Sequence, residues 1–173
     1  MGIGVAAKAL APKLISIQVF ALTQVAMDIE PGVRMALDSD VLHGWTHTLA
    51  GAVPVALASA VIWKILERRR IWRWTFDPIT PAMLWTTCFV GAWSHVLLDA
   101  LIHRDMASTR ALLPLDQSLF LSHEGVQMAC MVFAGVGAVV LAARLGWPEF
   151  RGLFVRIGRN LSQAPGWFSR STH

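Results

Sequence analysis

AMLWTTCFVGAWSHVLLDALI, residues 82–102, is the stretch of sequence that decides the fold. Asp99 is the single Asp, Glu, Lys or Arg within it. A helix needs about 20 apolar residues to cross the hydrocarbon of a bilayer, and this stretch supplies them. A membrane-spanning helix is therefore the first prediction.

Three further apolar stretches accompany it, at roughly 4–27, 47–65 and 119–143. Lys8, Pro12 and Lys13 interrupt the first, so that only residues 14–27 are cleanly apolar. The whole chain is 55% hydrophobic and 15% charged, which is more apolar than ordinary soluble domains. Because backbone groups in lipid must be satisfied within their own segment, we predict an all-α integral membrane bundle of about four transmembrane helices.

The basic residues lie beside the ends of these stretches, in the segments 8–13, 64–73 and 144–170. By the positive-inside rule these segments are cytoplasmic, as are both termini, and the connections 28–46 and 103–118 face the other side. The net charge of +4 thus predicts contact with membrane lipids and not with nucleic acid. Residues 1–143 form the predicted transmembrane domain, and residues 144–173 form a basic membrane-surface segment.

The stretch 82–102 ends with a polar stripe, because His95, Asp99 and His103 are spaced four residues apart and share one helix face. A His and an Asp one turn apart can bind one metal ion, or the Asp can orient the His. Ionisable residues inside a membrane are expensive and usually functional. His95 and Asp99 are therefore predicted metal ligands, whereas His103 alone is the polar end of a helix.

Two more sequence elements contain candidate metal ligands. His43 and His47 are also four residues apart and would share a face if this segment were helical. Pro31 is expected to end the first helix just after Asp28, whose carboxylate is disfavoured by the helix dipole there. A bound cation or Arg34 should therefore neutralise the charge of the Asp28 carboxylate.

A further His and Glu, His123 and Glu124, open the stretch 119–143. Glu124 suits a helix N-terminus in any case, so this pair has an ordinary interpretation as terminal polar residues. Four helices of alternating direction would nevertheless gather one polar layer at the non-cytoplasmic end: Asp28, His43, His47, His95, Asp99 and His123. Mixed imidazole and carboxylate ligands suit a divalent metal, zinc first and manganese or iron next.

With these residues in view, the chain resembles the bacterial inner-membrane metal-dependent hydrolases of the YdjM type. The resemblance covers residues 1–118 and lies in three elements: Asp28-Ile-Glu30-Pro31, His43-Gly-Trp-Thr-His47-Thr48 and Ser94-His95-Val-Leu-Leu-Asp99. It implies a multi-pass protein of the bacterial inner (plasma) membrane that hydrolyses its substrate with a bound metal. By carry-over the ligands would be Asp28, His43, His47, His95 and Asp99.

The chain departs from that family at two points. The family's arginine between the paired histidines is absent, and no histidine precedes His43 where the family carries one before its first helix. We therefore expect that Met1 is a downstream start and that the missing histidine is encoded just upstream.

The leading hypothesis is a membrane metallohydrolase in which Glu30 or His123 acts as general base. A site at the lipid boundary suggests a phosphoester or lipid-linked substrate. The alternatives are a metal-binding protein without catalysis, a structural membrane protein whose polar layer is a hydrogen-bonded cap, and a haem-binding bundle with His47 and His95 as axial ligands.

Overall fold

The computed structural model describes residues 2–69, 78–106, 109 and 122–145. Every element in this part of the chain is a helix, and it contains no strand. The predicted all-α class is confirmed for these residues. The elements are α1 (Gly2–Leu10), α2 (Ile17–Ala36), the short 3-10 helix η1 (Trp45–His47), α3 (Ala52–Arg68), α4 (Pro81–Ile102), the 3-10 helix η2 (Arg104–Met106) and α6 (His123–Leu145).

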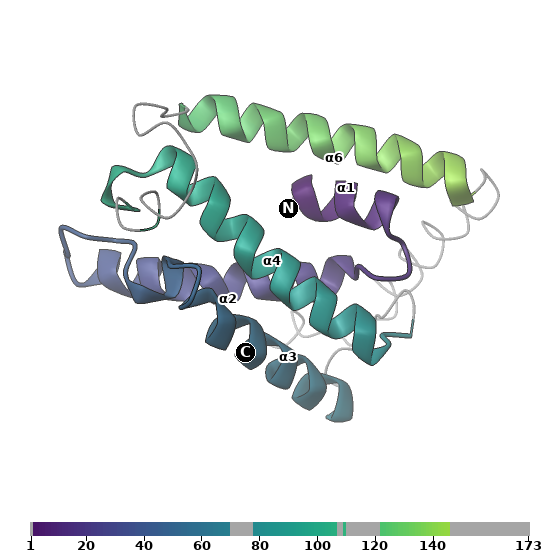
Figure 1. Ribbon diagram of the computed structural model, residues 1–173, viewed down its shortest axis with the longest axis horizontal. Helices are drawn as coiled ribbons and strands as arrows, with labels where there is room; N and C mark the ends of the chain where they lie inside the picture. Colours follow the sequence, from purple (N-terminus) through teal and green to yellow (C-terminus); the bar gives the residue numbers. More distant parts are fainter. Residues whose placement is uncertain (1, 70–77, 107–108, 110–121, 146–173) are drawn as a thin grey trace, which may run out of the picture.

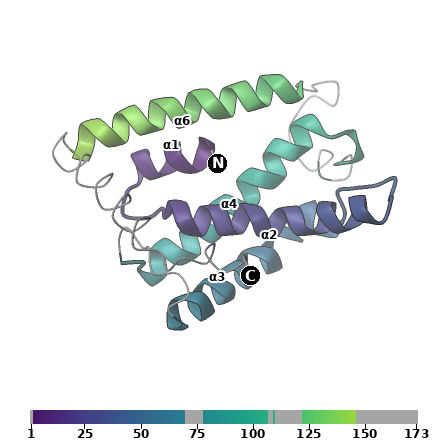
Figure 2. The ribbon, with the colours of Figure 1, turned by 180° about the vertical axis from the view of Figure 1, so that it is seen from behind.

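Helix α4 is the centre of the arrangement. Thr80 caps it by accepting a hydrogen bond from the Met83 backbone N–H, and Pro81 occupies its first turn, where a missing N–H does no harm. Figures 1 and 2 show α2 and α3 along one side of α4 and the pair α1 and α6 along the other. Because the long helices alternate in direction, α2 and α4 end where α6 begins (Figure 1).

Small side chains allow the central helices to approach closely. Ala52, Ala56 and Ala60 of α3 and Cys88 and Ala92 of α4 are almost completely buried in one apolar core. Such residues let helix backbones pack tightly against one another. The core thereby fixes the relative positions of the helices that carry the polar residues.

The first apolar stretch, 4–27, is two helices and not one, so the predicted single crossing there is wrong. Pro12 lacks a backbone N–H, and the chain leaves the helix at Leu10 and reverses direction before α2 (Figure 1). Lys8 donates a hydrogen bond to the Pro12 carbonyl across this turn. Ser16 then caps α2 by accepting from the Val19 N–H.

The prediction that Pro31 ends the first helix is also wrong, because α2 continues through it to Ala36. Proline removes one hydrogen bond, the one its N–H would donate to the Met27 carbonyl. An ion pair between Glu30 and Arg34 bridges this point, with 2.9 Å between Oε1 and Nε. Asp28 therefore lies inside a helix and not at its C-terminus.

His43 and His47 do not share an α-helical face, which corrects the helical reading of that segment. His43 lies in an irregular segment, η1 begins at Trp45, and α3 begins only at Ala52. The predicted start of the second stretch at residue 47 was thus five residues early.

Two helices in the described part of the chain, Pro81–Ile102 and His123–Arg144, are long and apolar enough to cross a membrane. Four crossings are not established, because α3 is 17 residues long and α2 carries charged residues along its second half. The predicted membrane-surface segment 144–173 lies almost entirely outside the described residues.

Candidate metal centre

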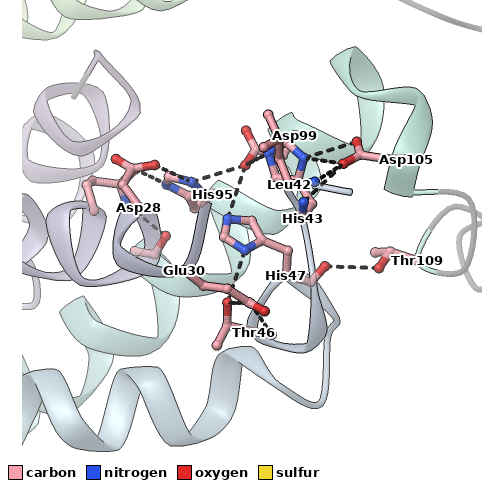
Figure 3. A network of polar contacts seen from close by, with 12 residues as sticks. Asp28, Glu30, Leu42, His43, Thr46, His47, His95, Asp99, Asp105 and Thr109 are labelled. Atoms are coloured by element: carbon pink, nitrogen blue, oxygen red, sulfur yellow. Dashed lines mark hydrogen bonds and ion pairs between the residues drawn. The ribbon is translucent and has the colours of Figure 1, made fainter. Parts of the chain in front are cut away.

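Three imidazole rings surround one carboxylate oxygen at the C-terminal end of α4 (Figure 3). The oxygen is Oδ2 of Asp99, and it lies 3.1 Å from Nε2 of His95, 3.4 Å from Nε2 of His47 and 3.8 Å from Nε2 of His43. The rings come from α4, from η1 and from the segment before it. In each case the nitrogen facing Asp99 is Nε2.

His47 is held by a chain of hydrogen bonds on its other side. The Thr46 hydroxyl donates to Glu30 Oε2, which can only accept while it is ionised. The hydroxyl has no second hydrogen, so its 3.1 Å contact with His47 Nδ1 requires that Nδ1 carries the proton and donates it. Nε2 of His47 is then unprotonated, and its lone pair is directed at Asp99.

His95 has the same arrangement with a different partner. The side-chain amide of Gln24 donates to the Gly91 carbonyl at 2.9 Å, which orients its Oε1 toward the ring. Oε1 lies 3.0 Å from His95 Nδ1 and can only accept, so this nitrogen also carries a proton. Nε2 is the nitrogen left for the centre.

His43 is oriented by a carboxylate. Asp105 accepts hydrogen bonds from the backbone N–H groups of Leu42 and His43, at 3.1 and 3.0 Å, and lies 3.0 Å from Nδ1 of the His43 ring. Burial opposes ionisation of Asp105, but these hydrogen bonds from His43 hold the pKa of its carboxyl below the usual range. All three rings thus donate outward through Nδ1 and turn Nε2 inward.

This arrangement places acceptors face to face unless a proton or a metal ion lies between them. Nε2 of His47 is buried and has no hydrogen-bond partner among the described residues. Burial lowers the pKa of His47 to about 4, against the attraction of Asp99, so the ring is neutral near pH 7. A neutral imidazole whose far N–H is fixed by an acceptor is the form that binds metal ions. The donor set therefore fits a divalent cation.

Asp28 completes the group from α2. Its Oδ1 lies 3.3 Å from Nε2 of His95, and its side chain is 65% exposed. The five residues proposed from the sequence as metal ligands are thus brought together from separate elements. The centre is open to its surroundings on the side of Asp28 and closed on the side of His47, whose side chain is 1% exposed.

The two residues predicted as general bases lie differently. Both carboxylate oxygens of Glu30 accept hydrogen bonds, from Arg34 and from the Thr46 backbone and hydroxyl. Burial raises the pKa of Glu30, but these bonds outweigh it and hold the pKa below its usual value. His123 is exposed at the first residue of α6, and no hydrogen bond or ion pair among the described contacts joins it to the centre.

A second group of possible ligands shares His43 and consists of His43, His103 and Asp105. The rings of His43 and His103 are in contact, with centroids 4.2 Å apart and their planes tilted by 33°. Asp105 already accepts two backbone hydrogen bonds and the His43 N–H. We therefore assign Asp105 to the orientation of His43, and take the group around Asp99 as the metal centre.

Sequence reasoning missed three residues that orient the rings: Gln24, Thr46 and Asp105. Each is a single polar residue without a repeating pattern around it, and Gln24 is 71 residues from the ring it contacts. A polar residue inside an otherwise apolar helix was the one available signal for Gln24.

Gly44 leaves room for the Glu30–Arg34 pair where this segment approaches α2. A Cβ atom at position 44 would overlap the side chains of Glu30 and Arg34. With glycine there, Glu30 reaches Thr46, and the chain Arg34–Glu30–Thr46–His47 can form.

Thr46→Val should weaken the binding of a divalent cation such as zinc about tenfold, because valine keeps the shape of threonine but leaves His47 Nδ1–H without an acceptor. Titration against a chromophoric zinc chelator measures the affinity. Thr46→Ser keeps the hydroxyl and should bind as the wild type does. Equal affinities for the valine and serine variants would contradict the orienting role of Thr46.

No protein-family model, curated protein or solved structure matches the chain. The interpretation of the site therefore rests on its geometry.

Proposed function

We propose that this chain is a membrane-embedded metalloprotein that binds one divalent cation and hydrolyses a phosphoester or lipid-linked substrate with it. The observation that supports the metal is the arrangement of three Nε2 atoms around one oxygen of Asp99, each ring tethered outward through Nδ1. The proposed ligands are Asp99, His43, His47 and His95, with Asp28 at the open side.

Zinc is the preferred ion in this proposal. Catalytic zinc sites hold the ion with three protein ligands of the imidazole and carboxylate type and keep one position open for water or substrate. His43, His47 and Asp99, whose ligand atoms all lie within 4.8 Å of one another, supply such a set of three. His95 would be a fourth ligand, and the exposed Asp28 marks the open side. Manganese and iron use similar ligands and are the next candidates.

The proposed placement in a membrane rests on the distribution of apolar residues, and the choice of the bacterial inner membrane rests on the resemblance to the YdjM-type family alone. Helix α6 exposes Met128, Met131, Val132, Val136 and Val139 to its surroundings. A helix this apolar and this exposed is stable in lipid, where such a surface needs no covering. We propose that α4 and α6 cross the membrane together with α3, with the C-terminal end of α6 at the cytoplasmic face and the metal centre at the other face.

Hydrolysis is proposed because of what such an ion does when bound: it lowers the pKa of a water molecule to about 7 and polarises a phosphoryl or acyl oxygen. In this chain Asp28 is the exposed carboxylate beside the ligands and is placed to accept a proton there. Glu30 is engaged by Arg34 and Thr46, so we propose that it positions His47.

Haem binding has little support from the geometry. The rings of His47 and His95 lie 5.4 Å apart at their centroids, edge to face, which is direct ring contact. A porphyrin between them would have to separate the two rings. The stronger alternative is metal binding without catalysis, in which the same ligands hold the ion for structural reasons.

Metal analysis of the detergent-purified protein tests the proposal. The wild type should retain about one zinc ion per chain after dialysis, and a strong chelator should remove it. The chelated protein and the zinc-reloaded protein are then incubated with a panel of phosphodiesters and phospholipids. Product release that needs the ion supports hydrolysis; a wild type without bound metal would sink the metal centre, and zinc without any product would leave binding without catalysis.

A further inference from the structure

A cavity of about 370 Å³ lies on the side of α4 opposite the α2–α3 pair. It is lined by Ile3 of α1, Leu98 of α4, and Ser122, Gly125, Ala129 and Phe133 along α6. Ser122 is the polar exception among these side chains, and it directly precedes α6. Helix α6 begins at the end of the bundle where α4 stops (Figure 1). The cavity is therefore apolar along its length and polar at one end.

From this cavity we infer that the substrate of the metal centre is a lipid whose acyl chain lies between α4 and α6. The inference rests on the proposed function and adds a substrate class to it. A volume of this size falls within the range of small-molecule binding sites. Its apolar lining excludes a free phosphoester or a sugar as its occupant.

The length of the cavity matches one acyl chain of a bilayer leaflet. Ser122 and Phe133 are eleven residues apart on α6, which is about 16 Å at 1.5 Å per residue. Half of a hydrocarbon core about 30 Å thick is about 15 Å. A chain that fills the cavity would thus end near the middle of the membrane and begin at the level of the centre.

The cavity and the metal centre lie on neighbouring faces of the last turns of α4, because consecutive helical residues point about 100° apart. Leu98 lines the cavity, and the next residue, Asp99, carries the oxygen that faces the three imidazoles. The headgroup of a lipid held beside Leu98 would emerge at the last turn of α4, next to the ligands. A lipid can reach the cavity from the bilayer, because Gly125, Ala129 and Phe133 of its lining are themselves exposed.

Two glycines of α6 provide a matched pair of variants. Gly125 lines the cavity, whereas a Cβ atom at Gly135 would meet no atom within 4 Å. Gly125→Leu should fill part of the cavity, and Gly135→Leu adds the same side chain to the same helix in open space. Ala129→Phe is a second filling variant in case Gly125→Leu does not fold.

The experiment uses the zinc-loaded full chain in vesicles of phosphatidylethanolamine and phosphatidylglycerol that contain a trace of phospholipid with a photoreactive diazirine on its acyl chain. In the wild type and in Gly135→Leu, crosslinks should map to the cavity face of α6, including Ala129. Filling the cavity should reduce them about tenfold. Metal content should be equal in all variants.

Equal labelling of the cavity face in Gly125→Leu or Ala129→Phe and in the wild type would overturn the inference, as would labelling confined to the outer face of α6 or crosslinks to a second copy of the chain. These outcomes are separate from failure of the proposed function, which is a wild type without bound zinc.

Discussion

Asp99→Asn is expected to lower bound zinc from about one ion per chain to none after dialysis. Oδ2 of Asp99 is the one atom that faces Nε2 of all three imidazoles, and asparagine keeps its shape while removing the charge. A carboxylate ligand must be ionised to bind a metal ion, and a neutral amide is a far weaker ligand. Elemental analysis of the purified variant measures the loss.

Asp40→Asn is the matched control, because Asp40 is an exposed carboxylate in the connection between α2 and η1. It should retain the zinc content of the wild type. Asp99→Asn should also remain helical by circular dichroism, since it removes a partly buried charge without changing volume. A folded Asp99→Asn variant that keeps a full zinc ion would show that Asp99 is not a ligand.

Asp105→Asn is expected to weaken zinc binding by about 10- to 100-fold without abolishing it. Asp105 touches His43 through Nδ1 and through the backbone N–H, and it also holds the N–H of Leu42. Asparagine replaces one accepting oxygen by an amide that donates, so the His43 ring loses its fixed orientation. Competition with a chromophoric chelator gives the affinity.

Asp38→Asn is a suitable control for Asp105→Asn. Asp38 is exposed and has a backbone φ of 50°, a conformation that asparagine also adopts readily. Its affinity should equal that of the wild type. Loss of all zinc in Asp105→Asn would instead make Asp105 a ligand, and would favour the second group with His43 and His103 as the metal centre.

The sequence predicted which residues lie close together better than it predicted how their rings are oriented. The four-residue spacing of His95 and Asp99 is a local property of one helix, so it could be recognised without knowledge of the fold. Asp28 and His43 could be added because helices of alternating direction bring alternate connections to one end. Gln24, Thr46 and Asp105 orient the imidazole rings through contacts between different elements. The spacing of residues within one element does not reveal such contacts.

The errors in the predicted elements have local causes. Pro31 was expected to end a helix, but a proline removes a single hydrogen bond, and the helix regains support from the Glu30–Arg34 pair. The interruption at Pro12 was visible in the sequence, yet the reversal of the chain there was not. Reversal depends on the contact of α1 with α6, two segments more than 100 residues apart.

The outward tethering of the three rings also links the centre to the acidity of its surroundings. When no ion is present, three lone pairs and a carboxylate cannot face one another at these distances without at least one proton among them. Metal uptake must expel that proton, because both occupy the same space. Loading the protein with zinc is therefore an exchange of one cation for another, and an acidic medium shifts that exchange toward the ion-free protein.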